Sequence, residues 1–466
     1  MGNISIEKII KLHSRKIYGI FLSSSVHPVD EKLPLWKLLF FGFQHVLAMY
    51  SGAVAVPLVL AQAINLDTER LIYLINADLF TCGIATLVQT LSVGPYIGSK
   101  LPIVQGCTFT AVMPMIIIAN SAGGGSEGLQ AVYGSAIVSG LVCFVIANYF
   151  SKLLRFFPPV VTGSVITIIG LTLMPVAVGW IAGLDPTAAD FADPVYIMMA
   201  VLVLAIIMIF YRCFTGLLSH IAVLLGLILG TIIACFMGYV DFTPVAKAAS
   251  LGITTPFAFG LPTFDPAACV AMTLVMLVTM AETTGDMMAI TEIVEKPMSK
   301  NLLTRALRAD GFSTMLGGVL NAFPYTAFAQ NIGLITLTGV RSRYVVATSA
   351  VIMMLLGLCP KLAAIVSCIP PMVLGGAGLA MFGMVAASGI RSLSKVEFHD
   401  NCNMMVIAIS VGVAMIPVCS PGFYSKFPVT MQLICNSSIT IGSITAMLLN
   451  FLLNKPQKEE TFLEEN

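Results

Sequence analysis

Five ionisable side chains lie inside long apolar stretches of the chain, and the spacing of two of them indicates proton chemistry. The five are His45, Asp78, Glu282, Asp286 and Asp310. Glu282 and Asp286 are four residues apart, so on a helix they share one face. Two close carboxylates in a medium of low dielectric cannot both ionise cheaply, and one is expected to hold a proton near neutral pH. A proton-coupled carrier needs such a group. Gly285, between the two acids, is expected to allow close packing.

Each of these side chains also has a structural alternative. The Glu282–Asp286 pair could cap or bridge neighbouring helices, and Asp310 could be an N-cap at the membrane interface. Asp78 could only anchor its helix, and His45 could be a satisfied structural histidine. A charge at the centre of a bilayer costs about 3 kcal/mol even on lenient scales, which keeps a functional role the default for each group.

The elements that hold these groups are expected to be membrane helices, because the composition excludes most other classes. Of 466 residues only 10% are charged, against about 25% in a soluble domain, and 58% are hydrophobic. With a net charge of +1, a basic surface for nucleic acid is excluded, and the apolar excess excludes disorder. Continuous apolar runs argue against an outer-membrane barrel. We expect an all-α polytopic membrane protein without a removable signal peptide.

Apolar runs long enough to cross a bilayer, about 20 residues each, predict fourteen transmembrane segments. They are expected at 36–60, 69–91, 104–121, 128–150, 159–181, 194–212, 215–238, 266–290, 309–322, 330–339, 343–359, 371–391, 402–418 and 437–454. With the N-terminus inside, 20 of the 24 Lys and Arg residues fall on the cytoplasmic side, as the positive-inside rule requires. Residues 1–35 and 455–466 are therefore expected to be cytoplasmic tails. His220, in the seventh segment, is interpreted as structural.

Two sequence echoes indicate that the halves of the chain are inverted repeats. A Pro-Pro pair begins the fifth segment at 158–159 and the twelfth at 370–371. A Pro also precedes a short polar, β-prone stretch in the third and tenth segments, at 105–110 and 327–331. Both echoes are offset by seven segments, an odd number, so the halves must be inverted in the membrane. Interrupted segments at equivalent positions of such repeats predict a substrate site, with half-helix N-termini directed at the ligand.

Residues 330–339 resemble a known family signature. They read QNIGLITLTG and fit the pattern Gln/Glu/Pro-Asn-x-Gly-x-x-x-x-Thr-Arg/Lys/Gly of the nucleobase–ascorbate transporters, also called the nucleobase:cation symporter-2 family. Gln44-His45, the stretch QGCTF at 105–109 and the Glu282/Asp286 pair support the resemblance. It extends over nearly the whole chain, and the sequence looks closest to the bacterial xanthine and uric acid permeases.

The resemblance implies an architecture that composition alone does not provide. Members of the family have fourteen segments in a 7+7 inverted repeat, with short strands in segments 3 and 10. Segments 1–4 and 8–11 form a core domain, here 36–150 and 266–360, and segments 5–7 and 12–14 form a gate domain, here 151–240 and 361–454. Members are usually homodimers, and bacterial members couple to protons, so a homodimer in the cytoplasmic membrane of a bacterium is expected. H⁺ is the expected coupling ion, and no cofactor, metal or nucleic-acid partner is expected.

The resemblance also implies site residues. Glu282 matches the essential acid that bonds the base, Gln330 the amide that reads its other edge, and Asn331 a neighbour needed for selectivity. The expected substrate-binding set is Glu282, Gln330, Asn331, Phe109, Thr108 and Gly333, and the expected proton-coupling set is Glu282, Asp286, Asp310 and His45. Backbone N–H groups near Phe109 and Gly333 are expected to reach the carbonyls of the base. The Phe109 ring could stack on the base, with simple packing as the alternative.

The expected function is proton-coupled import of a purine nucleobase by alternating access, with xanthine and urate both open. Glu282 can accept from two ring N–H groups, and the Gln330 amide can both donate and accept, which suits a flat purine-dione. Thr108 stands where several xanthine-specific members have Asn, whereas Asp286 matches the acid of xanthine-type members.

Three alternatives remain beside this expectation. The first is a permease of the same family for uracil or another nucleobase. The second is an anion exchanger of the same general fold, against which the acidic site argues. The third is a membrane enzyme or sensor, but the chain has no His-x-x-x-His metal pair, nucleotide loop or nucleophile–base constellation among its intramembrane polar residues.

Overall fold

The computed structural model describes residues 27–153, 157–184, 186–398 and 401–454, and within these ranges the chain is helical apart from two short strands. Most of the expected N-terminal tail and all of the expected tail at 455–466 lie outside the described residues. Up to residue 247 the elements are η1 (Pro28–Asp30), α2 (Leu35–Ala63), α3 (Thr68–Leu91), β1 (Gln105–Cys107), η2 (Phe109–Ala111), α4 (Val112–Ser121), α5 (Gly125–Leu153), α6 (Pro159–Ala182), α7 (Pro194–Cys213), α8 (Leu217–His220), α9 (Ala222–Phe236) and α10 (Thr243–Lys247). The remainder forms α11 (Pro266–Ile293), α12 (Lys300–Val319), β2 (Tyr325–Ala327), α13 (Ala329–Thr338), α14 (Arg343–Gly357), α15 (Pro360–Ser367), α16 (Pro371–Leu393), α17 (Asn401–Cys419), α18 (Val429–Cys435) and α19 (Ser438–Leu453).

The helix boundaries follow from local chemistry. Proline occupies the first turn of α6, α7, α11 and α16, where its missing N–H removes no helical hydrogen bond. Asp67, Asp193 and Asp265 accept backbone N–H groups as N-caps of α3, α7 and α11. Gly339, with φ of 68°, ends α13 in the left-handed conformation that glycine adopts without strain.

Eight helices in the described part of the chain are long and apolar enough to cross a membrane, or nine if the bent pair α14–α15 is one span. The eight are α2, α3, α5, α6, α7, α11, α16 and α17. The chain is therefore a multi-pass membrane protein. The helix formed by η2 and α4, and helices α9 and α19, are apolar but shorter.

Two of the expected segments differ from the helices in the structure. The ninth segment was expected at 309–322, but α12 begins at Lys300, because Ser299 caps it and the polar turns that carry Arg305 and Arg308 are helical too. The seventh segment, 215–238, is not continuous, because the chain departs from helical geometry at Ile221 between α8 and α9.

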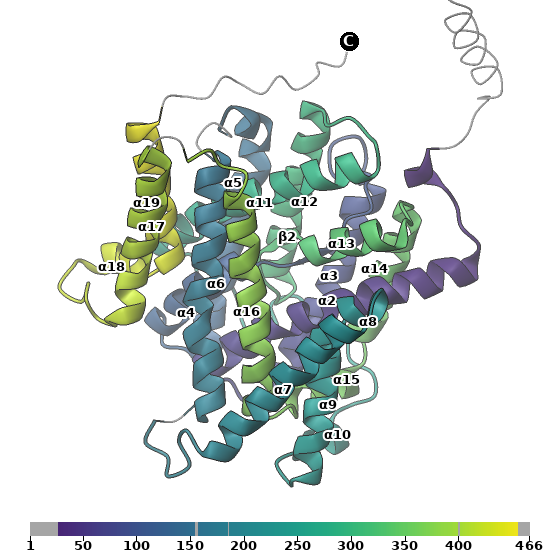
Figure 1. The fold of residues 1–466 in the computed structure, drawn as a ribbon, viewed down its shortest axis with the longest axis vertical. Helices are drawn as coiled ribbons and strands as arrows, with labels where there is room; N and C mark the ends of the chain where they lie inside the picture. The colour runs from purple at the N-terminus through teal and green to yellow at the C-terminus, as the bar shows by residue number, and fades with distance from the viewer. Residues whose placement is uncertain (1–26, 154–156, 185, 399–400, 455–466) are drawn as a thin grey trace, which may run out of the picture.

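Three helix pairs pack closely because glycines line their contacts. In the first, α6 and α16, a Cβ at Gly170 would lie 2.3 Å from the Ala386 nitrogen, so only glycine fits. Gly163 faces Leu393 and Gly375 faces Ile181, so the two helices are antiparallel. Figure 1 shows them side by side, with α7 crossing obliquely. Such small-residue contacts let membrane helices approach each other closely.

The other two helix pairs, α5 with α12 and α3 with α14, also meet at glycines. Gly140 of α5 meets Gly311 of α12, where a Cβ on either residue would lie 2.7 Å from the carbonyl oxygen of the other. Gly83 of α3 packs on Met354 of α14, while Gly357 of α14 packs on Phe80 of α3. Both pairs are therefore close and antiparallel.

The two strands form the centre of the fold. β1 and β2 pair antiparallel, with Gln105 opposite Ala327 and Cys107 opposite Tyr325, and all of their residues are buried. Outside the ladder, the Phe328 N–H donates to the Val104 carbonyl at 2.9 Å. Each strand leads directly into a helix, β1 into η2 and α4, and β2 into α13. The expected short strands in the third and tenth segments are confirmed.

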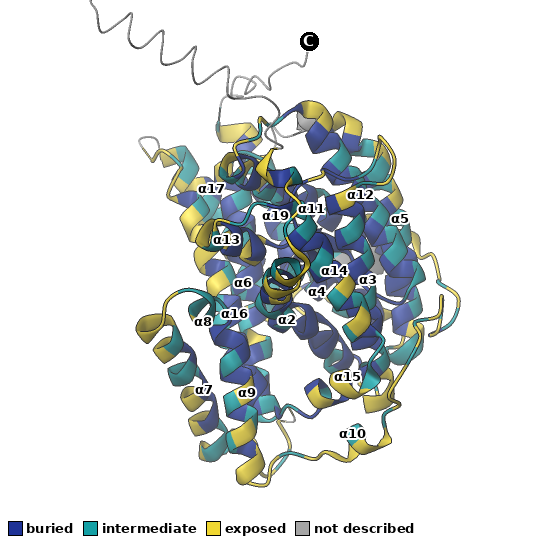
Figure 2. Cartoon of the chain, turned by 90° about the vertical axis from the view of Figure 1, so that its right-hand side faces the viewer, coloured by how far each residue is buried: buried dark blue, intermediate teal, exposed yellow. Residues whose placement is uncertain are grey.

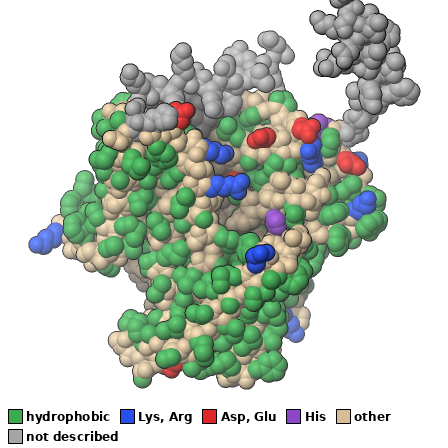
Figure 3. Space-filling view, viewed as in Figure 1, with side chains coloured by type: hydrophobic (Ala, Val, Ile, Leu, Met, Phe, Trp, Pro, Cys, Tyr) green, Lys and Arg blue, Asp and Glu red, His purple; other side chains and the backbone are tan. Residues whose placement is uncertain are grey.

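The distribution of burial and charge fits a membrane environment. In Figure 2 the interior faces of α2, α3 and α11 are buried, whereas α7 carries a largely exposed outer face. Only 22% of the most apolar stretch of α7 and 17% of that of α17 is buried within the described chain, so lipid or a partner subunit must cover the rest. Hydrophobic side chains cover most of the face in Figure 3, and the charged side chains gather mainly towards its upper end.

Candidate functional site

The site is built where two short helices start beside the strand pair. α13 begins at Ala329, immediately after β2, and η2 begins at Phe109, immediately after β1. The first N–H groups of a helix have no partner within the helix and attract electron-rich groups. In α13 these first groups include the N–H of Gln330, whose side chain is exposed. Two helix N-termini therefore flank the strand pair, as the sequence predicts.

Glu282 is held by a hydroxyl from the third segment. It lies near the middle of α11, which packs against η2, β2 and α13. The Thr110 hydroxyl donates to Glu282 Oε2 at 3.2 Å. The Glu282 side chain is only partly accessible, and its other oxygen is left for a ligand or a proton. Thr110 lies in the polar stretch at 105–110 that the sequence indicates, but it was not among the expected site residues.

Asp310 is the most deeply buried of the acids. It is 0% exposed and lies inside α12, so it is not an N-cap, and Ser299 has that role. The Gln105 amide Nε2 donates to Asp310 Oδ1 at 2.8 Å, which ties α12 to β1. The other oxygen of Asp310 and the Gln105 Oε1 have no hydrogen-bond partner among the described residues. An acid held on one side and open on the other can accept a proton without rearranging its support.

Asp286 completes a group of three carboxyls. It lies one turn beyond Glu282 and within electrostatic reach of both Glu282 and Asp310. Its Oδ2 is buried and has no hydrogen-bond partner among the residues that the structure describes. In the described part of the chain, the Lys/Arg ion pairs join Arg70 to Asp67, Arg341 to Glu295 and Arg343 to Asp30, and none reaches these three acids. Protons and uncharged donors must therefore stabilise the group.

The sequence predicts close packing at Gly285, between Glu282 and Asp286, and the structure shows that this prediction is wrong. No atom lies within 4 Å of where its Cβ would be, and the residue is exposed. The side of α11 that carries it therefore faces open space rather than a neighbouring helix. Space beside the two acids is what access of a ligand or a proton requires.

The contact between His45 and Asn331 determines whether His45 Nδ1 donates or accepts a hydrogen bond. The Asn331 Nδ2 lies 3.0 Å from the His45 carbonyl oxygen and 3.0 Å from His45 Nδ1. A carbonyl oxygen can only accept, so the amide must present its NH₂ group there. The same group then donates to Nδ1, which must be unprotonated. In this conformation His45 therefore accepts from Asn331 at Nδ1 and orients its side chain.

The remaining expected substrate-binding residues are Thr108, Phe109 and Gly333. Thr108 is buried, and its hydroxyl accepts from the Thr110 N–H at 3.2 Å, so it starts η2. Phe109 is partly exposed, and its ring meets Phe382 of α16 edge-on at 6.1 Å. Gly333 is the fifth residue of α13, so helix geometry commits its N–H to Ala329, and the free N–H groups lie earlier in α13. Gly333 contributes space instead.

Two further polar residues border the site. His220 Nε2 lies 3.7 Å from where a Cβ of Gly333 would be, so α8 faces α13. Sequence reasoning treated His220 as structural, because a single histidine gives no signal of what it faces. Asp78 is buried in α3 and accepts from the Tyr325 hydroxyl at 2.9 Å, so it anchors β2 rather than only its own helix. Within the described residues, no group of three or more His, Cys, Asp or Glu side chains is arranged to hold a metal ion.

Comparisons with known proteins give a consistent result. A family profile with the description "Permease family" matches residues 36–423. The chain is 44% identical to the xanthine permease of Bacillus subtilis, over 92% of this chain and 96% of the relative. It is 40% identical to the uric acid transporter UacT of Escherichia coli, over 94% of this chain and 90% of the relative. It is 45% identical to the nucleobase transporter PlUacP of Paenibacillus larvae, over 91% and 96%.

Solved structures are similar in fold at low sequence identity. The transmembrane domain of the cyanobacterial bicarbonate transporter BicA matches with a TM-score of 0.58 at 14% identity, covering 90% of this chain and 99% of that one. The murine Solute Carrier 26 family member A9 anion transporter, in its inward-facing state, matches with a TM-score of 0.61 at 14% identity, covering 95% and 75%.

Proposed function

Because the chain belongs to the xanthine/uracil permease family, the nucleobase–ascorbate transporters, we propose that it imports xanthine or urate together with protons across a bacterial cytoplasmic membrane. It is a permease rather than an enzyme. Relatives named for xanthine and for uric acid are about equally similar, at 44% and 43% identity, so both bases remain candidates. H⁺ is the proposed coupling ion.

The observation that carries this proposal is an acidic site that no Lys or Arg of the described chain pairs with, set beside two helix N-termini. A purine-dione presents ring N–H donors and carbonyl acceptors around a flat ring. The Glu282 carboxylate accepts from the N–H groups, while the Gln330 amide and the first N–H groups of α13 donate to carbonyls. Phe109, Thr108, Asn331 and Gly333 complete the proposed binding site: Phe109 by ring contact, Thr108 by starting η2, Asn331 by orientation and Gly333 by leaving space.

Protons are proposed to be carried by the acidic group. Glu282, Asp286 and Asp310 are close, buried or half-buried, and without a Lys or Arg partner in the described chain. Protonation of one of these carboxyls as the base binds reduces the charge that the moving site must carry through the membrane. His45 was expected to belong to this set. Its hydrogen bonds to Asn331 instead favour a positioning role.

We further propose fourteen segments in a 7+7 inverted repeat. The helix pairs support this, because a two-fold axis in the membrane plane exchanges equivalent segments. The third segment meets the tenth through β1 and β2, and the fifth meets the twelfth through α6 and α16. The second segment packs on the eleventh (α3 on α14). In the same way the ninth segment packs on the fourth (α12 on α5). All four pairs are antiparallel, as inversion requires.

On this plan residues 36–150 and 266–360 form a core domain, and 151–240 and 361–454 form a gate domain. Motion of the core against the gate then provides alternating access. The cluster of basic residues near the starts of α12 and α14 supports a cytoplasmic location for that end and for both termini. A homodimer, held by gate helices with exposed apolar faces, is the proposed assembly.

Two other functions have weaker support. A preference for uracil or another nucleobase would use the same edge-reading groups. Anion exchange is suggested only by the fold, since the bicarbonate and anion transporters are 14% identical or less. Three carboxyls without a cationic partner disfavour an inorganic anion at this site.

The test is uptake of radiolabelled xanthine and urate by cells that lack their own purine carriers. Expression of the chain should give uptake that unlabelled xanthine or urate reduces, with uracil, guanine and hypoxanthine as competitors that define the preference. Uptake of uracil but of neither purine would refute the purine assignment. Chloride or bicarbonate exchange without base uptake would favour the anion alternative.

A further inference from the structure

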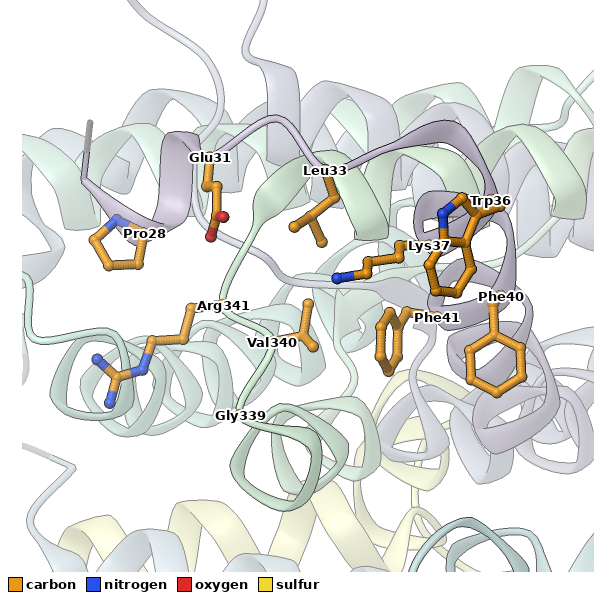
Figure 4. A pocket seen from close by; sticks show the side chains of 10 residues that line it. All are labelled: Pro28, Glu31, Leu33, Trp36, Lys37, Phe40, Phe41, Gly339, Val340 and Arg341. Atoms are coloured by element: carbon orange, nitrogen blue, oxygen red, sulfur yellow. The ribbon is translucent and has the colours of Figure 1, made fainter. Parts of the chain in front are cut away.

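A groove outside the transport site lies where α2 begins. It has a volume of about 460 Å³, and it is formed by η1, the first turns of α2 and the loop between α13 and α14. Figure 4 shows its polar members, Glu31, Lys37 and Arg341, beside the apolar Leu33, Val340 and Phe41. One end of the groove is lined by charged side chains and the other end by apolar side chains.

The apolar end continues onto a lipid-facing surface. Trp36 is 65% exposed and Phe40 is 57% exposed, on the first turns of a helix that spans the membrane. Leu35, Leu39 and Phe43 extend the same exposed face along α2. Tryptophan at the start of a spanning helix is typical of the boundary between headgroups and acyl chains. The groove therefore opens at the depth of lipid headgroups.

The polar end holds opposite charges that do not neutralise each other. Lys37 Nζ lies 5.5 Å from the centre of the Trp36 ring. Lys37 and Glu31 form no ion pair, although both point into the same space in Figure 4. Arg341 also lines the groove, but its guanidinium is paired with Glu295 at 2.9 Å, which leaves Lys37 and Glu31 as the unpaired charges among the described groove residues. A ligand that fits must carry a negative and a positive group together, next to an apolar tail.

We propose that this groove binds one ethanolamine phospholipid of the surrounding bilayer. Its phosphate would accept from Lys37, and its primary ammonium would donate to Glu31. Its acyl chains would lie along the exposed face of Trp36 and Phe40. A choline headgroup has no N–H to give Glu31, and a glycerol headgroup has no positive charge to balance it. Among these three headgroups, charge complementarity therefore selects ethanolamine.

The groove is connected to the helix that carries the base-reading amide. Its wall includes Gly339, the C-cap of α13, and the next residues of the loop. The Ser342 hydroxyl donates to the Glu31 carbonyl at 2.6 Å, which ties η1 to this loop. A bound lipid therefore contacts the far end of the helix that presents Gln330, and it should make transport depend on the headgroup.

The test measures lipid binding directly, so it does not depend on transport. The purified full-length protein is titrated with short-chain ethanolamine, choline and glycerol phospholipids, and bound lipids are counted by native mass spectrometry. The wild type should bind the ethanolamine lipid roughly five- to tenfold more tightly than the choline lipid, as expected for a charge-assisted contact. Lys37→Gln and Glu31→Gln should each remove that preference. Lys395→Gln, which neutralises an exposed lysine beyond α16, is the matched control.

Each other outcome overturns the proposal. Equal binding of ethanolamine and choline lipids by the wild type would remove the headgroup selection. Tighter binding of the glycerol lipid, increased further by Glu31→Gln, would assign the groove to an anionic lipid. Ethanolamine lipid binding that appears only after deletion of residues 1–26 would assign the groove to that segment. A preference that survives both variants would place the lipid elsewhere, and thermal melting curves would confirm that the variants are folded.

Discussion

At the scale of single residues, uncharged donors hold the acids of the site. Thr110 bonds Glu282 and Gln105 bonds Asp310, and each acid keeps one oxygen free of these bonds. Such support lets a carboxyl gain or lose a proton without losing its position. The sequence singled out these acids as candidates, because charge inside apolar segments is rare. It could not predict their donors, since threonine and glutamine carry no comparable signal.

Glu282→Gln should abolish uptake of labelled base while the protein remains in the membrane. The amide cannot accept from two ring N–H groups at one edge, and it cannot carry a proton. Loss of a charge-assisted contact with the base predicts a fall in uptake of roughly 100-fold. Glu292→Gln, at an exposed position near the end of the same helix, is the control and should transport normally. Near-normal uptake by Glu282→Gln would contradict the assignment.

His45 should be replaceable by a residue that can accept a hydrogen bond at the position of Nδ1. The Asn331 NH₂ group needs an acceptor where Nδ1 now lies. His45→Asn can supply an oxygen there, whereas His45→Leu leaves a buried N–H without a partner, a cost of about 1–3 kcal/mol. We expect His45→Leu to raise the KM of uptake about tenfold and His45→Asn to restore much of the loss. Equal impairment of both variants would favour a proton-carrying role for His45.

At the scale of elements, the strand pair and its two helices position the site. Their sequence signal was a Pro before a short polar, β-prone stretch, repeated seven segments later. That signal predicted the strands but not their pairing, because pairing depends on residues more than 200 positions apart. It also could not predict the start of α12, where a capped polar turn precedes the apolar run. Helix starts in polar sequence leave no hydropathy signal.

Gly106→Ala should weaken this strand pair. A Cβ at Gly106 would lie 2.4 Å from the Phe328 ring, which is buried at the N-cap of α13. The ring must shift and take the start of α13 with it, at a cost of about 1–3 kcal/mol. We expect a lower thermal midpoint and reduced uptake, both partly recovered when Phe328→Leu is added. Gly179→Ala, whose Cβ would meet no atom within 4 Å, is the control. Equal effects of the two alanine variants would contradict the steric explanation.

At the scale of the whole molecule, the antiparallel pairs suggest two bodies that move against each other. The pairs α3–α14 and α5–α12 join segments of the proposed core, and α6–α16 joins segments of the proposed gate. Phe109 and Phe382 meet across these bodies, as do His220 and Gly333. The repeat and the topology are predictions from the sequence, in which inversion follows from an odd offset. The sequence carries no sign of these cross-body contacts, which depend on how the two bodies sit against each other.

Rigid-body motion of the core predicts a specific pattern of distances. Spin labels at positions 300 and 395 measure a distance between the core and the gate, and labels at positions 100 and 300 measure a distance within the core. All three positions are exposed lysines. In a background without the exposed Cys213, Cys235 and Cys419, adding xanthine or urate should change the first distance distribution and leave the second unchanged. Changes in both distances, or in neither, would contradict motion of the core as a unit.

Uptake driven by a proton gradient in proteoliposomes measures the proposed symport most directly. With the purified wild type, an acidic outer medium should drive accumulation of labelled xanthine or urate above the outer concentration. A protonophore should abolish that accumulation while exchange of internal for external base continues. The same gradient should drive no accumulation through Glu282→Gln. Accumulation that ignores the gradient, or that persists in Glu282→Gln, would contradict proton symport through this acidic site.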